Sequence, residues 1–265
     1  TFTINPTPVL VIVDPAGVCS PSTVNIQVAA VTTGTTNEGV NTYYTDATAL
    51  STYATPTTAD SAQYFIVTTT ANSCTDTAAV NAVVNPLLTI TLSTVPDICF
   101  GTTSAVFPYS ATTNTPNEYS IDWDGTAETA GLVDVAQTTL TANSITITGL
   151  AAIAAGTYNG TITVVNTTTG CSSTQAISFT IDPLPTVSVN IETICADDAA
   201  ATFTATSATA TAWLWSEEGT GTNQTTTGTD AGNYTVVVTD GNSCTNTATG
   251  TLTVNARPTV TVNSE

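Results

Sequence analysis

A proline-containing segment recurs four times along the chain and sets its organisation. It begins each time at an Asn or Asp that ends a run of alternating apolar and polar residues, and another alternating run follows it. Proline fixes φ, lacks an amide donor and holds the preceding residue in an extended conformation. A strand can therefore end, cross a short stiff linker and restart in a new domain. These segments, which we call joints, begin at Asn5, Asn85, Asp182 and Asn255.

The joints divide the 265 residues into three repeats, each of a length typical of small domains. We expect repeat 1 at residues 6–85, repeat 2 at 86–182 and repeat 3 at 183–256. Residues 1–5 have the pattern of the last strand of a preceding repeat, and residues 257–265 that of the first strand of a following one. We therefore interpret the sequence as part of a longer array.

Composition excludes several classes of function. The formal net charge is −19, Arg257 is the single base, and there is no Lys and no His. Such a chain cannot neutralise nucleic-acid phosphates, and docking on an anionic membrane is disfavoured for the same reason. No apolar run approaches the roughly 18 to 20 residues of a membrane-spanning helix. Disorder is excluded because 41% of the residues are hydrophobic and they alternate in short, regularly spaced runs.

Repeat 3 shows the predicted fold most clearly. Its short alternating runs are separated by turn signals such as Asp240-Gly241, which predicts an antiparallel β-sandwich. Thr makes up roughly a quarter of the chain, and β-branched residues suit half-buried strands. No segment of the chain has a convincing helical period. The predicted strands of repeat 3 cover residues 186–191, 201–206, 211–216, 224–227, 235–239 and 247–255.

Aromatic residues support an immunoglobulin-like version of the sandwich. The motif Asp230-x-Gly232-x-Tyr234 resembles the tyrosine corner of such domains, and Tyr64 and Tyr158 occupy weaker copies of it. We assign these three tyrosines a structural role. An aromatic also recurs on the third strand, and burial in the core is expected for Trp123 and for at least one of Trp213 and Trp215.

Repeat 2 is about 20 residues longer than the others, and the excess lies at about residues 123–145. We predict an extra hairpin or a long excursion between two strands. The insertion is either decoration or a place where this repeat binds a ligand, because loops on a rigid scaffold commonly carry function.

The cysteines are spaced as one pair per repeat. The first member follows a joint by about a dozen residues, and the second precedes the next joint by about a dozen. This regularity predicts three disulfides, each within one repeat, and an oxidising compartment outside the cytoplasm. Zinc binding is the competing interpretation, but the sequence has no CxxC and no His. The predicted pairs are Cys19/Cys74, Cys99/Cys171 and Cys195/Cys244.

The sequence lacks the usual catalytic groups. Without His and Lys, the common general bases are missing, so we predict that the chain is not an enzyme. Carboxylate pairs remain as weak candidates for binding Ca²⁺, which takes oxygen ligands. The alternative is that these acids are solvated turn residues, and no other cofactor is expected. The candidate calcium ligands are Asp122, Asp124, Asp197 and Asp198.

Three sets of motifs resemble a known group of repeats. They are Tyr43-Tyr44-Thr45-Asp46 with Asn72-Ser73-Cys74, Gly156-Thr157-Tyr158 with Gly170-Cys171, and Gly232-Asn233-Tyr234 with Asn242-Ser243-Cys244. These look like the Ig-like and PKD-like repeats of very large cell-surface proteins from gliding and related Bacteroidota. The resemblance implies export by the type IX secretion system and display as an adhesin, including adhesins of gliding motility.

The same resemblance implies a modification. O-glycosylation in Bacteroidota favours Asp followed by Ser or Thr and then a small or apolar residue. Asp60-Ser61-Ala62 and Asp76-Thr77-Ala78 fit this pattern, so Ser61 and Thr77 are candidate acceptors.

We therefore predict three tandem immunoglobulin-like β-sandwiches in an extended rod, located on the bacterial cell surface. The favoured function is a structural stalk or filament segment of an adhesin that displays a binding tip. One alternative is a module that binds a carbohydrate or a protein, and another is a self-assembling fibre subunit. Expected partners are neighbouring repeats of the same chain and a surface or glycan ligand bound outside this segment, with no nucleic acid and no insertion into a membrane.

Overall fold

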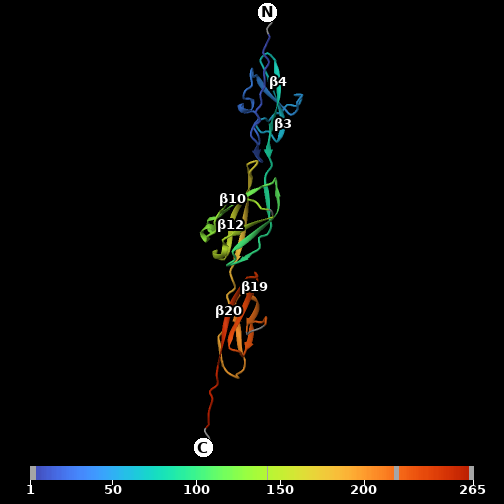
Figure 1. Cartoon of the computed structure of the whole chain (residues 1–265). Helices are drawn as coiled ribbons and strands as arrows, with labels where there is room; N and C mark the ends of the chain where they lie inside the picture. The colour runs from blue at the N-terminus through green and yellow to red at the C-terminus, as the bar shows by residue number, and fades with distance from the viewer. Residues whose placement is uncertain (1–3, 142, 218–220, 263–265) are drawn as a thin grey trace.

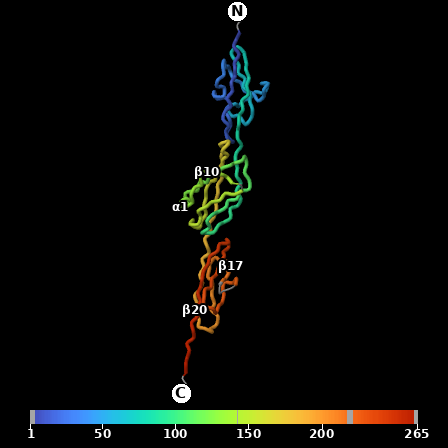
Figure 2. Tube along the Cα trace, viewed as in Figure 1, coloured from blue at the N-terminus to red at the C-terminus, as the bar shows by residue number. Residues whose placement is uncertain are grey.

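The computed structural model describes residues 4–141, 143–217 and 221–262. It shows three β-sandwiches arranged end to end in an elongated molecule, with the two termini at opposite ends (Figure 1). The chain passes once from each sandwich to the next (Figure 2). Among the described residues, no helix is long and apolar enough to cross a membrane.

Repeat 2 is a sandwich of a five-stranded and a three-stranded sheet. Neighbouring strands are antiparallel, except that β7 runs parallel to the end of β13. The five-stranded sheet has the order β10 (Val135–Thr139), β9 (Glu118–Trp123), β12 (Gly156–Asn166), β13 (Cys171–Asp182) and β7 (Ile98–Cys99). The other sheet has the order β11 (Ser144–Thr148), β8 (Ser104–Thr113) and β6 (Thr89–Leu92), and η2 covers Leu150–Ala152.

Repeat 3 has the same plan without the additional edge strand. Its long sheet again ends on a short strand, β15, that runs parallel to the last strand of the repeat. That sheet has the order β15 (Glu192–Cys195), β20 (Thr245–Asn255), β19 (Gly232–Asp240) and β17 (Ala210–Glu217). The facing strands are β14 (Ser188–Val189), β16 (Ala201–Thr206) and β18 (Thr225–Gly228).

Repeat 1 is less regular. Its main sheet has three strands, and its second sheet is replaced in part by isolated bridges such as Val24 to Ala59. The short strand β1 still runs parallel to the end of the repeat, on β5. The strands are β1 (Val18–Cys19), β2 (Val40–Tyr44), β3 (Ala62–Thr69), β4 (Thr75–Ala82) and β5 (Val84–Asn85), and η1 covers Ala29–Thr32.

Each repeat has its own apolar core, built from the inward-facing residues of alternating strands. Trp123 and Trp215 are each only 3% exposed, whereas Leu214 between the two tryptophans of β17 is 57% exposed. The predicted burial of the tryptophans is therefore confirmed. Among the largest fully buried side chains are Ile26 and Ile66 in repeat 1, Phe107 and Ile162 in repeat 2, and Phe203 and Tyr234 in repeat 3.

The three corner tyrosines make the same hydrogen bond. Each hydroxyl donates to the carbonyl oxygen of the residue four positions earlier, across the turn that leads into the strand. Burial and the nearby Tyr53 hydroxyl raise the pKa of Tyr64 to about 12, so this phenol stays protonated at neutral pH. The bonds run from Tyr64 to Asp60 (3.3 Å), from Tyr158 to Ala154 (2.8 Å) and from Tyr234 to Asp230 (3.1 Å).

The insertion of repeat 2 contains the one α-helix found in the described residues, α1 (Gly125–Ala130). The Asp124 carboxylate caps it by accepting the Ala127 amide at 2.8 Å, and Gly131 ends it with φ of 106°. The sequence showed no convincing helical period in this segment. A helix of six residues is too short to show a 3.6-residue period, but an Asp followed seven residues later by Gly was a visible signal.

Candidate functional site: the interdomain joints

In every repeat, the first cysteine lies beside the residue at which the next joint begins. The short parallel strand that carries it is paired with the end of the last strand, so that Cys19 faces Asn85, for example. The residue after each of these cysteines donates its amide to the joint residue's carbonyl at 2.8 Å. The three facing pairs are Cys19 with Asn85, Cys99 with Asp182 and Cys195 with Asn255.

The second cysteine lies at the opposite end of the same sandwich. It starts or immediately precedes the last long strand, 11 residues before the joint in each repeat, as from Cys171 to Asp182. At about 3.3 Å per strand residue, this separation is roughly 36 Å. A disulfide needs Cα atoms within about 7 Å of each other, so the two cysteines of one repeat cannot bond.

The disulfides therefore join successive repeats. The first cysteine of one repeat bonds to the second cysteine of the next, with Cα atoms 5.6 Å and 5.5 Å apart in the two bridges. In Figure 1 the yellow turn of repeat 2 reaches the end of repeat 1, and the red turn of repeat 3 reaches the end of repeat 2. The bridges are Cys19–Cys171 and Cys99–Cys244, and Cys74 and Cys195 are free.

This pattern corrects the predicted pairing. Disulfides are present, but the pairs Cys19/Cys74, Cys99/Cys171 and Cys195/Cys244 are wrong. Regular spacing within a repeat was taken as proximity, although the whole length of the last strand lies between the two cysteines. The signal that could have revealed this was the constant spacing of 11 residues, which is one strand length.

A side chain near each second cysteine also holds the strand that enters its repeat. The residue two positions after that cysteine bonds to the backbone of the entering segment in all three repeats. Each joint is thus fixed by its peptide linker, by this bond and, between adjacent repeats, by a disulfide. The bonds are Leu10 N to Asp76 Oδ2 (2.7 Å), Ser173 Oγ to Leu88 O (2.7 Å) and Asn246 Nδ2 to Pro185 O (2.8 Å).

The joint residue of repeat 2 differs from the other two. Asn85 donates its side-chain amide to the Val18 carbonyl at 3.3 Å, but Asp182 cannot donate when it is ionised. Asp182 is 8% exposed, and its Oδ2 has no hydrogen-bond partner among the described residues. A buried carboxylate oxygen without a partner costs free energy, so repeat 2 is less stable here than the fold allows.

We expect Asp182→Asn to stabilise repeat 2, by about 1 kcal/mol or roughly 5 °C in its melting temperature. The new amide can donate to the Ile98 carbonyl, the counterpart of Val18. Thermal unfolding followed by circular dichroism measures the shift, and Asn85→Asp is the matched control, expected to lower the stability of repeat 1. A lower melting temperature for Asp182→Asn would contradict the assignment.

The four candidate calcium ligands do not form one group. The Asp124 carboxylate caps α1, and Asp122 lies exposed on β9. In repeat 3, Asp198 is paired with Arg257, while Asp197 has a φ of 69° in the adjacent turn. Within residues 4–141, 143–217 and 221–262, no cluster of three or more His, Cys, Asp or Glu is placed to hold a metal ion.

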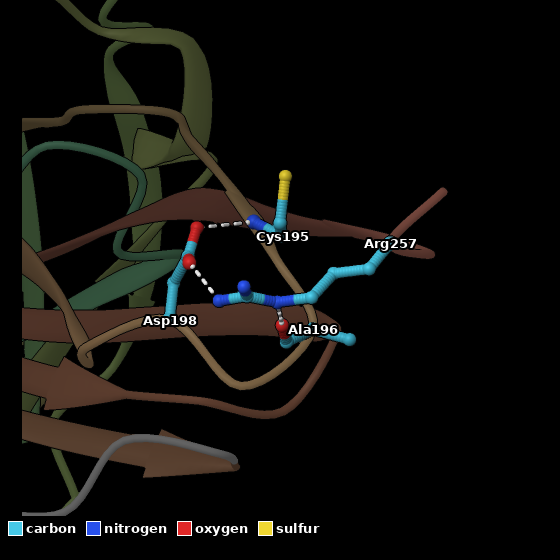
Figure 3. A network of polar contacts seen from close by, with 4 residues as sticks. All are labelled: Cys195, Ala196, Asp198 and Arg257. Carbon is cyan, nitrogen blue, oxygen red and sulfur yellow. Dashed lines mark hydrogen bonds and ion pairs between the residues drawn. The ribbon is translucent and has the colours of Figure 1, made fainter. Parts of the chain in front are cut away.

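Figure 3 shows the contacts of Asp198 in repeat 3. Asp198 accepts the Cys195 amide at 2.8 Å with one oxygen and pairs with Arg257 at 2.7 Å through the other. The guanidinium also donates to the Ala196 carbonyl. Both charged side chains are about half exposed, so the ion pair itself contributes little, but it fixes the chain around the exposed Cys195.

A surface groove of about 430 Å³ lies beside the insertion of repeat 2, lined by residues 131–136 and 146–149. The Asp134 carboxylate at its wall accepts a hydrogen bond from the Trp123 backbone amide at 2.9 Å, so this carboxylate is engaged within the protein. The candidate acceptors Ser61 and Thr77, both in repeat 1, are exposed.

The order of the strands in the sheets identifies the fold. The chain is a tandem of immunoglobulin-like β-sandwiches. Solved structures similar to it include the N-terminal eight Ig domains of Down syndrome cell adhesion molecule, at 12% identity and a TM-score of 0.47, covering 95% of this chain and 37% of that one. The I67–I69 fragment of titin is similar at 11% identity and a TM-score of 0.45, covering 96% of this chain and 100% of that one.

A third similar structure is SGBP-B of Bacteroides ovatus in complex with a mixed-linkage heptasaccharide, at 14% identity and a TM-score of 0.27, covering 96% of this chain and 72% of that one. This chain spans little more than a third of the length of the Down syndrome cell adhesion molecule fragment described above. No family model and no curated protein matches the sequence.

Proposed function

We propose that the chain is a stiff stalk segment of an extracellular bacterial surface adhesin, which holds a binding tip away from the cell. The observation that supports this most strongly is the pair of disulfides between successive repeats. A single linker lets two domains swing about each other, and domain motion is the default when their interface is small. A second covalent link on another part of the same interface removes most of that freedom.

The dimensions and surface fit the same role. The longest strand, β13, has 12 residues, so a repeat is roughly 40 Å long and three in a row span on the order of 100 Å. A net charge of −19 keeps neighbouring stalks apart. Disulfides persist outside the cytoplasm, which agrees with an extracellular location. Type IX secretion, a part in gliding, and glycans on Ser61 and Thr77 belong to the same proposal and follow from the resemblance of the repeats alone.

A binding module is the alternative that the stalk must be tested against. Exposed aromatic rings are the usual platform for sugars, but Trp123 and Trp215 are buried. The groove of repeat 2 has a mostly apolar lining, and its one carboxylate accepts a hydrogen bond from the backbone. These features favour a structural role over recognition by these three repeats, and they favour a non-enzymatic one.

Immunogold electron microscopy of intact cells tests the stalk. An antibody against repeats 2 and 3 is expected to label thin filaments that project from the cell surface. Pre-absorption of the antibody with the purified chain is the control and should abolish the label. Label found only on soluble secreted material would contradict an anchored stalk, and a glycan array with the isolated chain would then test the binding module.

A further inference from the structure

The two free cysteines lie in the same local structures as the bonded ones. Cys195 faces Asn255 across a parallel pair, as Cys19 and Cys99 face their joint residues. Its carbonyl accepts an amide from three residues later at 3.0 Å, and the corresponding distances are 2.9 Å at Cys19 and 3.1 Å at Cys99. Cys195 thus occupies the position of a first cysteine, and it has no disulfide partner among the residues that the structure describes.

Cys74 matches the bonded Cys244 in equal detail. In both turns, the residue before the cysteine has positive φ, 63° at Ser73 and 66° at Ser243. The carbonyl of each cysteine accepts the amide from four residues earlier, at 2.9 Å and 3.0 Å. A side-chain oxygen of that earlier residue accepts the cysteine amide in return, from Thr70 at 3.1 Å and from Asp240 at 2.9 Å.

We propose that Cys195 and Cys74 are the two halves of a further joint, in which Cys195 bonds to Cys74 of another copy of the chain stacked end to end. Both bridges in the structure join a first cysteine to the second cysteine of the next sandwich. Cys74 is the one second cysteine left without a bond, and all six cysteines lie in the described ranges. The kind of cysteine to which Cys195 would bond is therefore present in the chain itself, as Cys74.

Arg257 lies on the end of repeat 3 that such a joint would cover. Two copies with a net charge of −19 repel each other, and the chain's single base is held beside Cys195 through Asp198 and the Ala196 carbonyl. It lowers the negative potential at the contact. Joining of separate copies is therefore expected to be faster at high ionic strength, where the remaining repulsion is screened.

The bond needs an oxidant, and a small disulfide such as oxidised glutathione supplies it. One cysteine thiolate attacks that disulfide and releases one reduced glutathione, which leaves a mixed disulfide. The other cysteine thiolate then attacks the mixed disulfide and releases the second reduced glutathione. Two thiols lose two protons and two electrons, and one disulfide forms between Cys195 and Cys74.

The inference goes beyond the stalk proposal and does not depend on it, since it concerns only how two copies join. The second copy can be a separate molecule or can follow in the same polypeptide. In the latter case the second copy follows Glu265, so that Arg257 is kept at the joint. The chemistry of the bond is the same in both cases.

Two proteins, both exposed to oxidised glutathione, distinguish these sources. The first is the 265-residue chain, and the second is a tandem in which Thr1 of one copy follows Glu265 of another. Cleavage before aspartate places the six cysteines of a copy in six different peptides, so mass spectrometry identifies each bond. A Cys195–Cys74 peptide from the first protein indicates joining of separate molecules, and the same peptide from the tandem alone indicates joining within one polypeptide.

Thiol titration gives an independent readout. The tandem is expected to keep two reactive thiols instead of the four that two unjoined copies carry. Cys195→Ser in its first copy should leave three thiols. Adding Thr193→Cys to that variant, on the same exposed strand, should not restore a bond, because the thiol is displaced by about two residues or 7 Å. Four thiols in the tandem, or peptides that pair Cys195 with Cys195, would overturn the proposal.

Discussion

Pulled by its two ends until all three repeats unfold, the oxidised chain is expected to extend to only about 390 Å, against about 920 Å after reduction. The limit follows from the shortest covalent path. It runs from the N-terminus to Cys19, across to Cys171, back along the chain to Cys99, across to Cys244 and on to the C-terminus. That path has about 111 residue steps of up to 3.5 Å, compared with about 264 for the linear chain.

The two bridges are redundant because the loops they close overlap. With Cys99–Cys244 removed, the path through Cys19–Cys171 has about 112 steps, and with Cys19–Cys171 removed the path through the other bridge has about 119. Each single removal therefore lengthens the limit by about 30 Å or less, whereas removal of both lengthens it by about 530 Å. A stalk built in this way keeps its maximum length when any one bridge is broken.

Single-molecule force spectroscopy measures these limits on the oxidised chain, on the two double-serine variants that each lack one bridge, and on the reduced chain. Disulfides within repeats predict a different result. Each disulfide would then keep the segment of about 50 to 70 residues between its cysteines from extending. Removal of each one would lengthen the maximum extension by roughly 170 to 250 Å. Separate steps of that size in the single-bridge variants would contradict the interdomain pairing.

Much of the fold was predictable from local patterns. Joints, alternating strands and the tyrosine corner each depend on residues close in the sequence, and proline and β-branched residues impose the same geometry wherever they occur. Burial of Trp123 and Trp215 followed from their inward-facing positions on predicted strands. The all-β immunoglobulin-like sandwich could therefore be recognised before any coordinates were known.

The site was not predictable in the same way because it depends on contacts between repeats. A pair such as Cys99 and Cys171 looks like a unit in the sequence, but a strand of 12 residues separates its members in space. The partner of Cys99 lies 145 residues away, in a turn that the rod brings against it. The capping role of Asp124 was equally hidden, since the helix it starts is too short for a periodic signal.

Trp123→Ala is expected to cost about 3 to 5 kcal/mol and to lower the melting temperature of repeat 2 by on the order of 15–30 °C. The indole is 3% exposed and packs edge-on against the Phe179 ring, with ring centroids 5.6 Å apart. Gly160 makes room for it, because a Cβ there would lie 2.7 Å from the Trp123 ring. Removal of the indole leaves a cavity that such a close-packed core cannot fill.

The loss extends beyond repeat 2, because this repeat supplies Cys171 to one bridge and Cys99 to the other. When repeat 2 unfolds, both neighbours lose the rigid body that connects them, and the rod becomes two sandwiches on a cross-linked flexible segment. Thermal unfolding and small-angle scattering measure the two effects, and Leu214→Ala, at a residue 57% exposed, is the matched control expected to change stability by less than about 0.5 kcal/mol. An unchanged melting temperature for Trp123→Ala would contradict the placement of the indole in the core.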